Sequence, residues 1–304
     1  TKPWYFPNYP LIHVFRPKNQ ETLAEMLLKN AKRRGADLRF ETPAVRLERE
    51  GNRVTGLIAQ DSRGSYIRFK AARGIVLCTG DYGNDRTMVE KYCWPSVAGL
   101  KCVYEPAVNT GDGHRMGMWV GAAIDEPPHC AMLFDFAVFS KAGLFNLARQ
   151  PWLYVNVKGD RFMNEDLPWG YECAQIMQQE GDFVWSIWDG KYDREWPKMR
   201  SQCCKNMGPP TYLWDPKQLE EALEGGNVLK ARTVEELARK MGVPVDTLKA
   251  TTDRYSELAR SGKDPDFGKH PDRLSTIEEP DFFACRMEAR YMVILGGLKI
   301  NTRL

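Results

Sequence analysis

Residues 154–165 read Tyr-Val-Asn-Val-Lys-Gly-Asp-Arg-Phe-Met-Asn-Glu, and this stretch is the most informative part of the chain. The apolar run over residues 152–157 is typical of a strand, and Lys158-Gly159-Asp160 has the composition of a turn. Arg161 begins the segment that follows, which ends on a carboxylate, Glu165. The stretch therefore predicts a strand, a glycine turn and a charged return segment, in which we expect Arg161 to hold the turn.

The residues that precede this stretch predict a helix and a small antiparallel meander. Thr22 and Glu25 form a capping-box pattern, and Gly35 fits the end of the helix. Short strand patterns separated by turn residues follow at 36–41, 44–48, 53–59 and 65–70. The apolar run from Gly74 to Gly80 then predicts a strand that is buried on both faces.

A second helix is expected to begin within Asn109-Thr110-Gly111-Asp112-Gly113. Glycines at the start of a helix let a ligand approach the backbone closely, and the exposed N–H groups there bind anions. A plain turn explains the same residues, so this motif alone leaves both interpretations open.

The residues that follow the informative stretch predict one more strand and two helices. The strand pattern covers 183–188, and Thr233 with Glu236 forms a second capping box. Gly242-Val243-Pro244 separates that helix from an amphipathic one over 246–260. The chain closes on an apolar segment, 292–300, around Gly296-Gly297.

Composition places the chain among ordinary globular proteins. Its 304 residues are 43% hydrophobic and 27% charged, enough for one large or two ordinary domains with a real core. A net charge of +3 gives no electrostatic reason for a nucleic-acid partner, and no apolar run is long enough to insert into a membrane. The 8 cysteines include no Cys-x-x-Cys pair, which disfavours zinc, iron–sulfur and c-type haem sites, so no metal is predicted.

Taken in order, these segments resemble the FAD-dependent flavoprotein family of fumarate reductases and succinate dehydrogenases, which includes urocanate reductase and 3-ketosteroid dehydrogenases. The matching motifs are Gly35-Ala36-Asp37 with Thr42–Val45, Val76–Asp85, Thr110–Gly113 with Gly121-Ala122, Tyr154–Glu165, Gly242–Pro244 with Ser261–Asp264, and Gly296–Leu298.

The resemblance implies a mixed fold of the α+β or α/β class. We expect part of a glutathione-reductase-like FAD-binding domain, made of the antiparallel meander and the buried strand, with an inserted α+β capping domain. The expected boundaries are 1–127 for the partial FAD-binding domain, 128–293 for the substrate-capping domain and 294–304 for the return to the first domain.

The resemblance also implies FAD as the cofactor and a set of residues that contact it. These cofactor-binding candidates are Ala44, Thr79, Gly80, Asp112, Gly296 and Gly297. The family's Gly-x-Gly-x-x-Gly turn, whose backbone amides hold the pyrophosphate, is expected upstream of Thr1, and its final segment beyond Leu304. We therefore expect a fragment truncated at both ends that by itself is inactive and binds FAD weakly or not at all. The compartment stays open between the cytoplasm and export by an upstream signal.

In such a family a hydride moves between the flavin and a substrate carbon, while the protein orients the substrate and supplies a proton. The cationic residues that fumarate reductases use are replaced here. Residues 166–169 contain no Arg, residues 291–295 contain no His, and Met132-Leu133 stands where a third His is expected. A buried dicarboxylate without fixed cations is costly, so we predict a more apolar or aromatic substrate than fumarate, reacting at a C=C or CH–CH group.

Three residues are candidates for catalysis. Tyr291 precedes the Gly-Gly pair and is either a proton donor or a packed aromatic residue. Arg290 is either a carboxylate ligand or part of a surface ion pair, and His129 is either catalytic or structural. Trp169 and Tyr171 are candidates to line the substrate pocket, although ordinary core packing is the better explanation of Trp169.

Two other classes of function remain open from the sequence. One is a catalytically inactive interaction module that keeps the flavoprotein fold, and the other is the flavoprotein subunit of an electron-transfer complex. The expected partner is a small-molecule substrate, and the sequence does not identify the electron donor.

Overall fold

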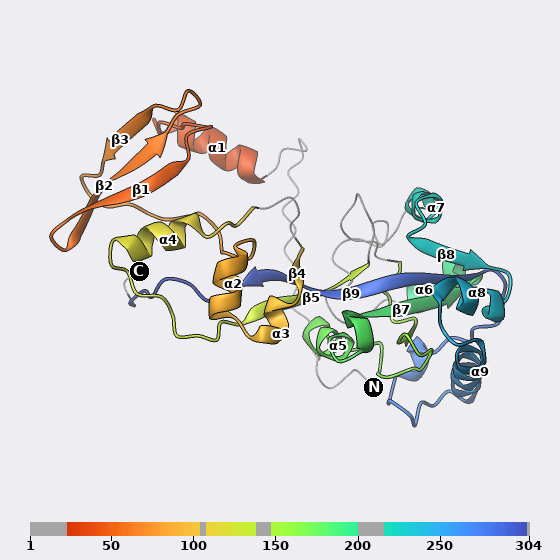
Figure 1. Cartoon of the computed structure of the whole chain (residues 1–304). Helices are drawn as coiled ribbons and strands as arrows, with labels where there is room; N and C mark the ends of the chain where they lie inside the picture. Colours follow the sequence, from red (N-terminus) through yellow and green to blue (C-terminus); the bar gives the residue numbers. More distant parts are fainter. Residues whose placement is uncertain (1–22, 104–107, 138–146, 200–215, 303–304) are drawn as a thin grey trace. The chain divides into compact units, whose positions relative to one another are not determined.

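The computed structural model describes residues 23–103, 108–137, 147–199 and 216–302, which divide into two compact units (Figure 1). The first, which we call the meander unit, comprises described residues 23–98, 108–131 and 293–302. The second, the six-strand unit, comprises described residues 99–103, 132–137, 147–199 and 216–292.

The meander unit is built on a three-stranded antiparallel sheet with the order β1-β2-β3. Asp61 makes the tight turn between β2 and β3, because its Oδ1 accepts hydrogen bonds from the backbone N–H groups of Arg63 and Ser65 at 2.9 and 2.8 Å. The elements of this unit are α1 (Leu23–Arg33), β1 (Ala44–Glu50), β2 (Arg53–Gln60), β3 (Tyr66–Lys70), α2 (Arg86–Tyr92), α3 (Pro95–Ala98) and α4 (Asp112–Trp119).

Two strands expected from the sequence are absent from the described part of this unit. Neither 36–41 nor 74–80 forms a strand, and the second segment is not buried, since Val76 is 85% exposed. An extended apolar run becomes a buried strand only where neighbouring strands satisfy its backbone. No described strand pairs with 74–80, so the prediction of a buried strand there was wrong.

The six-strand unit is organised around one long strand. Its elements are β4 (Lys101–Cys102), β5 (Ala131–Ala137), β6 (Leu153–Val155), α5 (Trp169–Ile176), η1 (Glu180–Asp182), β7 (Phe183–Asp189), α6 (Tyr192–Met199), α7 (Pro216–Glu224), β8 (Val228–Ala231), α8 (Val234–Met241), α9 (Val245–Ser261), η4 (Pro271–Arg273) and β9 (Phe282–Ile294).

Strand β9 is the hub of this sheet, and it pairs with β4, β5, β7 and β8 (Figure 1). The pairing with β7 is antiparallel from Phe183↔Glu288 to Asp189↔Phe282, and the pairing with β4 is parallel. Helices α8 and α9 pack against each other, and their apolar side chains join those of the strands in one buried cluster. The core of this unit therefore lies between the sheet and these two helices.

The two helices end and begin where the sequence predicts. The Glu236 N–H donates to Thr233 Oγ1 at 3.1 Å, and the Glu236 carboxylate accepts from the Arg232 N–H at 2.9 Å. Gly242 ends α8 and Gly262 ends α9, both in the left-handed conformation.

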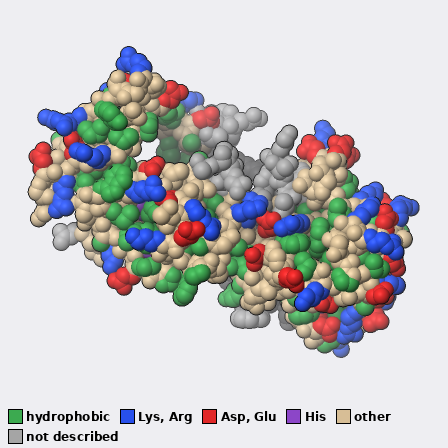
Figure 2. Space-filling view, viewed as in Figure 1, with side chains coloured by type: hydrophobic (Ala, Val, Ile, Leu, Met, Phe, Trp, Pro, Cys, Tyr) green, Lys and Arg blue, Asp and Glu red, His purple; other side chains and the backbone are tan. Residues whose placement is uncertain are grey.

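The described helices and the face shown in Figure 2 were compared with what a membrane span or a nucleic-acid interface requires. None of the described helices is long and apolar enough to cross a membrane. Basic and acidic side chains are interspersed on the face shown in Figure 2. This mixture, with the small net charge, gives no single-signed patch on that face for a polyanion.

Candidate functional site

The predicted cofactor residues Thr79 and Gly80 lie beside the start of α4. A Cβ on Gly113 would overlap the Thr79 side chain, and a Cβ on Gly80 would overlap the side chain of Asn109. Gly80 and Gly111 adopt left-handed backbone conformations, with φ of 74° and 75°. The first turn of α4 and the Thr79-Gly80 turn are therefore packed as closely as backbone allows.

Asp112 is the first residue of α4 and is exposed. Its Oδ2 accepts a hydrogen bond from Thr110 Oγ1 at 2.8 Å. The carboxylate is therefore held at the solvent-facing start of the helix, next to the turn that contains Thr79 and Gly80.

The second glycine pair, Gly296-Gly297, also packs against α4. A Cβ on Gly297 would lie 3.1 Å from His114 Nε2. The Gly297 N–H donates to Asp125 Oδ2 at 3.2 Å, and the Asp125 N–H donates to the Gly297 carbonyl at 2.8 Å. Thr79, Asp112 and Gly297 thus lie in α4 or directly against it, while Gly80 packs on Asn109 just before the helix and Gly296 packs on His129.

The sixth, Ala44, lies at the start of β1, where it pairs with Ala59. It is half-buried, and its described contacts are within the meander. The meander is tied to α4 at its other end, where Arg49 Nη1 donates to the Val120 carbonyl at 2.6 Å.

The catalytic candidate His129 belongs to a buried aromatic cluster that sequence reasoning missed. His129 stacks on Tyr92, with ring centres 5.6 Å apart, and its Nδ1 is hydrogen-bonded to the Tyr82 hydroxyl. Burial raises the pKa of Tyr82, which stays protonated. Tyr82 also contacts the edge of His114, at 5.4 Å between ring centres. No spacing rule joins these four residues, which lie on separate segments of the chain.

His114 has an unsatisfied atom in the part of the chain that the structure describes. Its Nδ1 is buried without a hydrogen-bond partner. Burial also lowers the pKa of His114, so the imidazole is neutral at pH 7. The nitrogen without a partner is Nδ1, whereas the nitrogen nearest Gly297 is Nε2, so the ring holds one buried, unpaired hydrogen-bonding atom on α4.

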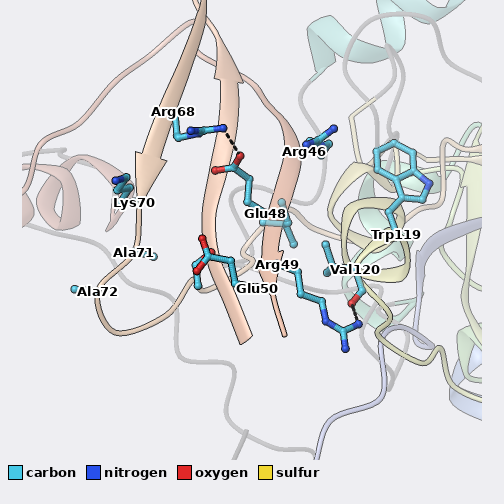
Figure 3. A pocket seen from close by; sticks show the side chains of 12 residues that line it. Arg46, Glu48, Arg49, Glu50, Arg68, Lys70, Ala71, Ala72, Trp119 and Val120 are labelled. Carbon is cyan, nitrogen blue, oxygen red and sulfur yellow. Dashed lines mark hydrogen bonds and ion pairs between the residues drawn. The ribbon is translucent and has the colours of Figure 1, made fainter. Parts of the chain in front are cut away.

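A groove of about 820 Å³ lies over the meander sheet and the end of α4 (Figure 3). Its charged side chains are Arg46, Arg49, Arg68, Lys70, Glu48 and Glu50. Arg68 pairs with Glu48 at 2.9 Å, and Arg49 donates to the Val120 carbonyl. The groove thus contains both basic and acidic side chains, and several of them are already engaged in an ion pair or a hydrogen bond with another residue of the groove. It therefore does not select an ion of one sign.

The remaining candidates lie in the six-strand unit. Arg290 and Tyr291 are buried side chains on β9, opposite Lys101 and Cys102 of β4. Arg290 Nη2 donates to Glu288 Oε2 at 3.3 Å, so this guanidinium lies beside a carboxylate. Tyr171, on α5, is 69% exposed. Trp169 begins α5, and its side chain lies outside the described residues.

The same unit contains a buried ion pair that the sequence analysis did not single out. The Arg149 guanidinium donates to both Asp135 oxygens, at 3.2 and 2.8 Å, and lies over the Phe134 ring at 4.4 Å. Burial by itself lowers the pKa of Arg149. The charge of Asp135, together with the smaller effect of the fully buried Glu172, outweighs burial and raises that pKa. These groups are far apart in sequence, so only the fold brings them together.

The turn at Lys158-Gly159-Asp160 and the segment after it are held by a second buried network. Arg161 pairs with Glu165 and with Asp264, each at 2.8 Å, and Lys269 Nζ lies 3.0 Å from Glu165. Burial lowers the pKa of Lys269 to about 8, although the Glu165 charge opposes the change. Burial by itself raises the pKa of Glu165, but Lys269 and Arg161 outweigh it and hold that pKa below its ordinary value. Arg161 therefore has the structural role expected of it.

Comparisons with known proteins place these features in context. Residues 11–304 match the model of the family described as FAD binding domain. The chain is 26% identical to a vinyl phenol reductase of Lactiplantibacillus plantarum, over 95% of this chain and 62% of that protein. It is 27% identical to an NADH:acrylate oxidoreductase of Vibrio harveyi, over 95% of this chain and 27% of that protein.

A solved structure shares the fold. The 3-ketosteroid delta1-dehydrogenase from Sterolibacterium denitrificans aligns with a TM-score of 0.68 at 25% identity, over 90% of this chain and 52% of that chain. The chain therefore spans less than two thirds of the length of each of these proteins.

Proposed function

The chain belongs to the FAD binding domain family, and from that premise we propose that it is part of a flavin-dependent oxidoreductase that transfers hydride between FAD and a C=C or CH–CH group. The family match confirms the resemblance seen in the sequence, and the structural likeness confirms the mixed α and β fold class. The observation that carries the proposal is the gathering of the two glycine segments around the start of α4.

The residues of the meander unit fit a flavin cofactor. Left-handed glycines at 80 and 111 leave the backbone bare, and the first N–H groups of α4 are a site for an anionic or polar group. The unpartnered His114 Nδ1 adds a hydrogen-bonding atom at the same place. We assign FAD contacts to Thr79, Gly80, Asp112, Gly296 and Gly297, and an adenine-facing backbone to Ala44. When bound, the flavin supplies the hydride chemistry.

We propose that one unit binds FAD and the other covers the substrate, as expected from the sequence. The meander unit corresponds to the partial FAD-binding domain, 1–127 with 294–304, and the six-strand unit to the substrate-capping domain, 128–293. In that arrangement Tyr291 is the proposed proton donor, Arg290 and His129 are further candidates, and Trp169 and Tyr171 contact the substrate.

The proposed substrate is an alkene conjugated to an aryl group rather than fumarate. The position of the fumarate reductases' Arg falls within 166–169, which holds no Arg, and the positions of their two His fall at 291–295 and at Met132-Leu133, which hold no His. Arg273 lies 3.6 Å from Asp166, so its charge is partly offset by that carboxylate. The relative that acts on vinyl phenol supports an aromatic substrate. A second candidate, an acrylate-type acid, is favoured only by the other relative's name.

The test is anaerobic reduction of the flavin in the intact protein, followed by reoxidation with a vinylphenol, an aryl acrylate or fumarate. We expect the flavin band to return fastest with the aryl alkenes. Rapid reoxidation by fumarate would overturn the substrate proposal. A protein with no flavin band even after addition of FAD would favour the inactive interaction module, and reoxidation only by a protein electron carrier would favour the electron-transfer subunit.

The role of Tyr291 has its own test with a matched control. Removing a proton donor slows the reaction by a factor of about 10² to 10⁴, so Tyr291→Phe should slow reoxidation by the alkene by that factor. The rate of flavin reduction by dithionite should not change. Tyr66→Phe is the control, because Tyr66 is 70% exposed on the meander. Equal reoxidation rates in the two variants would show that Tyr291 is not the proton donor.

A further inference from the structure

The hydrogen bonds of His129 fix which of its nitrogens carries the proton. His129 Nε2 lies 3.0 Å from the Asp125 carbonyl, which only accepts, so Nε2 carries the hydrogen. In the neutral ring Nδ1 is then an acceptor, and the Tyr82 hydroxyl donates to it. His129 is 3% exposed, so the two hydrogen bonds hold the ring from both sides in a dry environment.

The ring that is held in this way is the surface on which Gly296 rests. A Cβ on Gly296 would overlap the imidazole of His129, so the backbone of this residue lies directly on the ring. The next residue, Gly297, exchanges two hydrogen bonds with Asp125, the same residue whose carbonyl accepts from His129. His129 and Asp125 together form a seat for the Gly296-Gly297 backbone.

The Gly296-Gly297 segment and His129 are also connected to the turn at Thr79-Gly80. Asp81, which follows Gly80, accepts hydrogen bonds from the Gly83 N–H at 2.8 Å and from the Ile294 N–H at 3.0 Å. Tyr82 is the next residue, and its hydroxyl bonds to His129. Two adjacent residues, Asp81 and Tyr82, therefore connect the turn at Gly80 to the segment 294–297 by independent routes.

We infer that Tyr82 and His129 are positioning residues, which hold the Gly296-Gly297 backbone in register with the Thr79-Gly80 turn so that both present a single surface to the flavin. This inference rests on the proposed function for its ligand, while the ordering of the backbone stands on the contacts of the described residues. In this role each side chain acts through the two glycine segments and not on the substrate, so the inference chooses the structural alternative for His129.

The experiment compares Tyr82→Phe with Tyr92→Phe in the intact protein. Both residues contact His129 in the same cluster, but the Tyr92 hydroxyl is directed to Met118 Sδ at 3.8 Å and takes no part in the seat. Hydrogen exchange is followed by mass spectrometry on peptides that cover 293–299, and FAD affinity is measured by titration of flavin fluorescence.

A lost hydrogen bond of ordinary strength corresponds to a factor of about two to ten. We expect Tyr82→Phe to speed exchange over 293–299 and to weaken FAD binding by such a factor, while Tyr92→Phe leaves both unchanged. His129→Phe, which keeps an aromatic side chain of larger size and loses both hydrogen bonds, should reproduce the first variant with a larger effect.

Several results would overturn the inference. Exchange over 293–299 that is the same in Tyr82→Phe and wild type would show that the pair does not order the backbone. Faster exchange with undiminished FAD affinity would show that the ordering does not serve the flavin. Absence of FAD binding in the wild type would defeat the proposed function instead, and the exchange comparison would still decide whether Tyr82 orders the segment.

Discussion

Arg161 donates two hydrogen bonds to Asp264, a residue 103 positions later in the chain, at 3.1 and 2.8 Å. The same guanidinium binds Glu165 and lies over the rings of Tyr255 and Phe267. One side chain therefore ties the glycine turn after β6 to the loop after α9.

Removal of Arg161 should be strongly destabilising. Arg161→Met leaves Asp264 without its cation and Glu165 with Lys269 alone, and breaking a buried pair in this way costs about 3–5 kcal/mol. Arg161→Lys should be only partly tolerated, because an ammonium does not bind two carboxylates in the bidentate way. Urea unfolding followed by circular dichroism measures both. The control is Arg254→Gln, whose exposed pair with Asp266 should contribute about 1 kcal/mol or less, and equal losses in the two positions would contradict the prediction.

Acid should weaken this network in a defined direction. Glu165 and Asp264 have pKa values below their ordinary 4.5 and 3.8, because Arg161, with Lys269 for Glu165, outweighs the effect of burial. The unfolded chain therefore takes up protons first as the pH falls. The stability from the two carboxylates is complete above about pH 4.5 and is lost as the pH falls through the lowered folded-state values.

The check is the free energy of unfolding as a function of pH in wild type and Asp264→Asn. We expect a shallower dependence below pH 4.5 in the variant, since one of the two groups no longer titrates. Asp253→Asn, on the exposed face of α9, is the control and should retain the wild-type dependence. Parallel curves for Asp264→Asn and wild type would rule out Asp264 as a contributor.

The cysteines of the 304-residue chain should differ in reactivity. Cys78 and Cys130 are exposed, whereas Cys93, Cys102, Cys173 and Cys285 are buried. Burial raises the pKa of Cys285 to about 12, so almost none of it is thiolate at pH 8. Among the six cysteines that the structure describes, alkylation of the native chain with iodoacetamide, read by mass spectrometry, should modify Cys78 and Cys130 first. Early modification of Cys285 would show that β9 is not buried as described.

Gly296 should not tolerate a side chain. Gly296→Ala places a methyl group in the His129 ring, and relief of such overlap costs about 1–3 kcal/mol. The control is Gly74→Ala, where a Cβ meets nothing within 4 Å and the change should stay within about 0.5 kcal/mol. Thermal unfolding compares the two, and equal stability of both variants would argue against the packing of His129 on Gly296.

The parts of the fold that the sequence predicts are those set by local chemistry. The capping residue Thr233 and the glycines at 242 and 262 specify their helix ends through hydrogen bonds within a few residues. The same holds for the meander, whose turns are short. The segment 74–80 fails this rule, because the burial of a strand depends on neighbours and not on its own composition.

The site was predictable only where a motif marks it. The glycine motifs located the start of α4 and the segment at 296–297, because a bare backbone needs Gly whatever surrounds it. Tyr82 and His114 were missed, since an aromatic residue and a histidine look the same in sequence whether they pack or bind. The sequence predicts that Arg161 holds the glycine turn. It does not predict the partner Asp264, because no local pattern identifies a residue 103 positions away.

Strand β9 has a consequence for the order in which the chain is made. It is 13 residues long, follows β4, β5, β7 and β8 in the chain, and pairs with residues as early as Lys101, the partner of Arg290. During synthesis β4, β5, β7 and β8 leave the ribosome before β9, the strand with which they pair. Until β9 is made, their backbone N–H and C=O groups on that side have no partner strand. The nascent chain is therefore exposed to aggregation until Phe282–Ile294 emerge, and a chaperone is most useful in that interval.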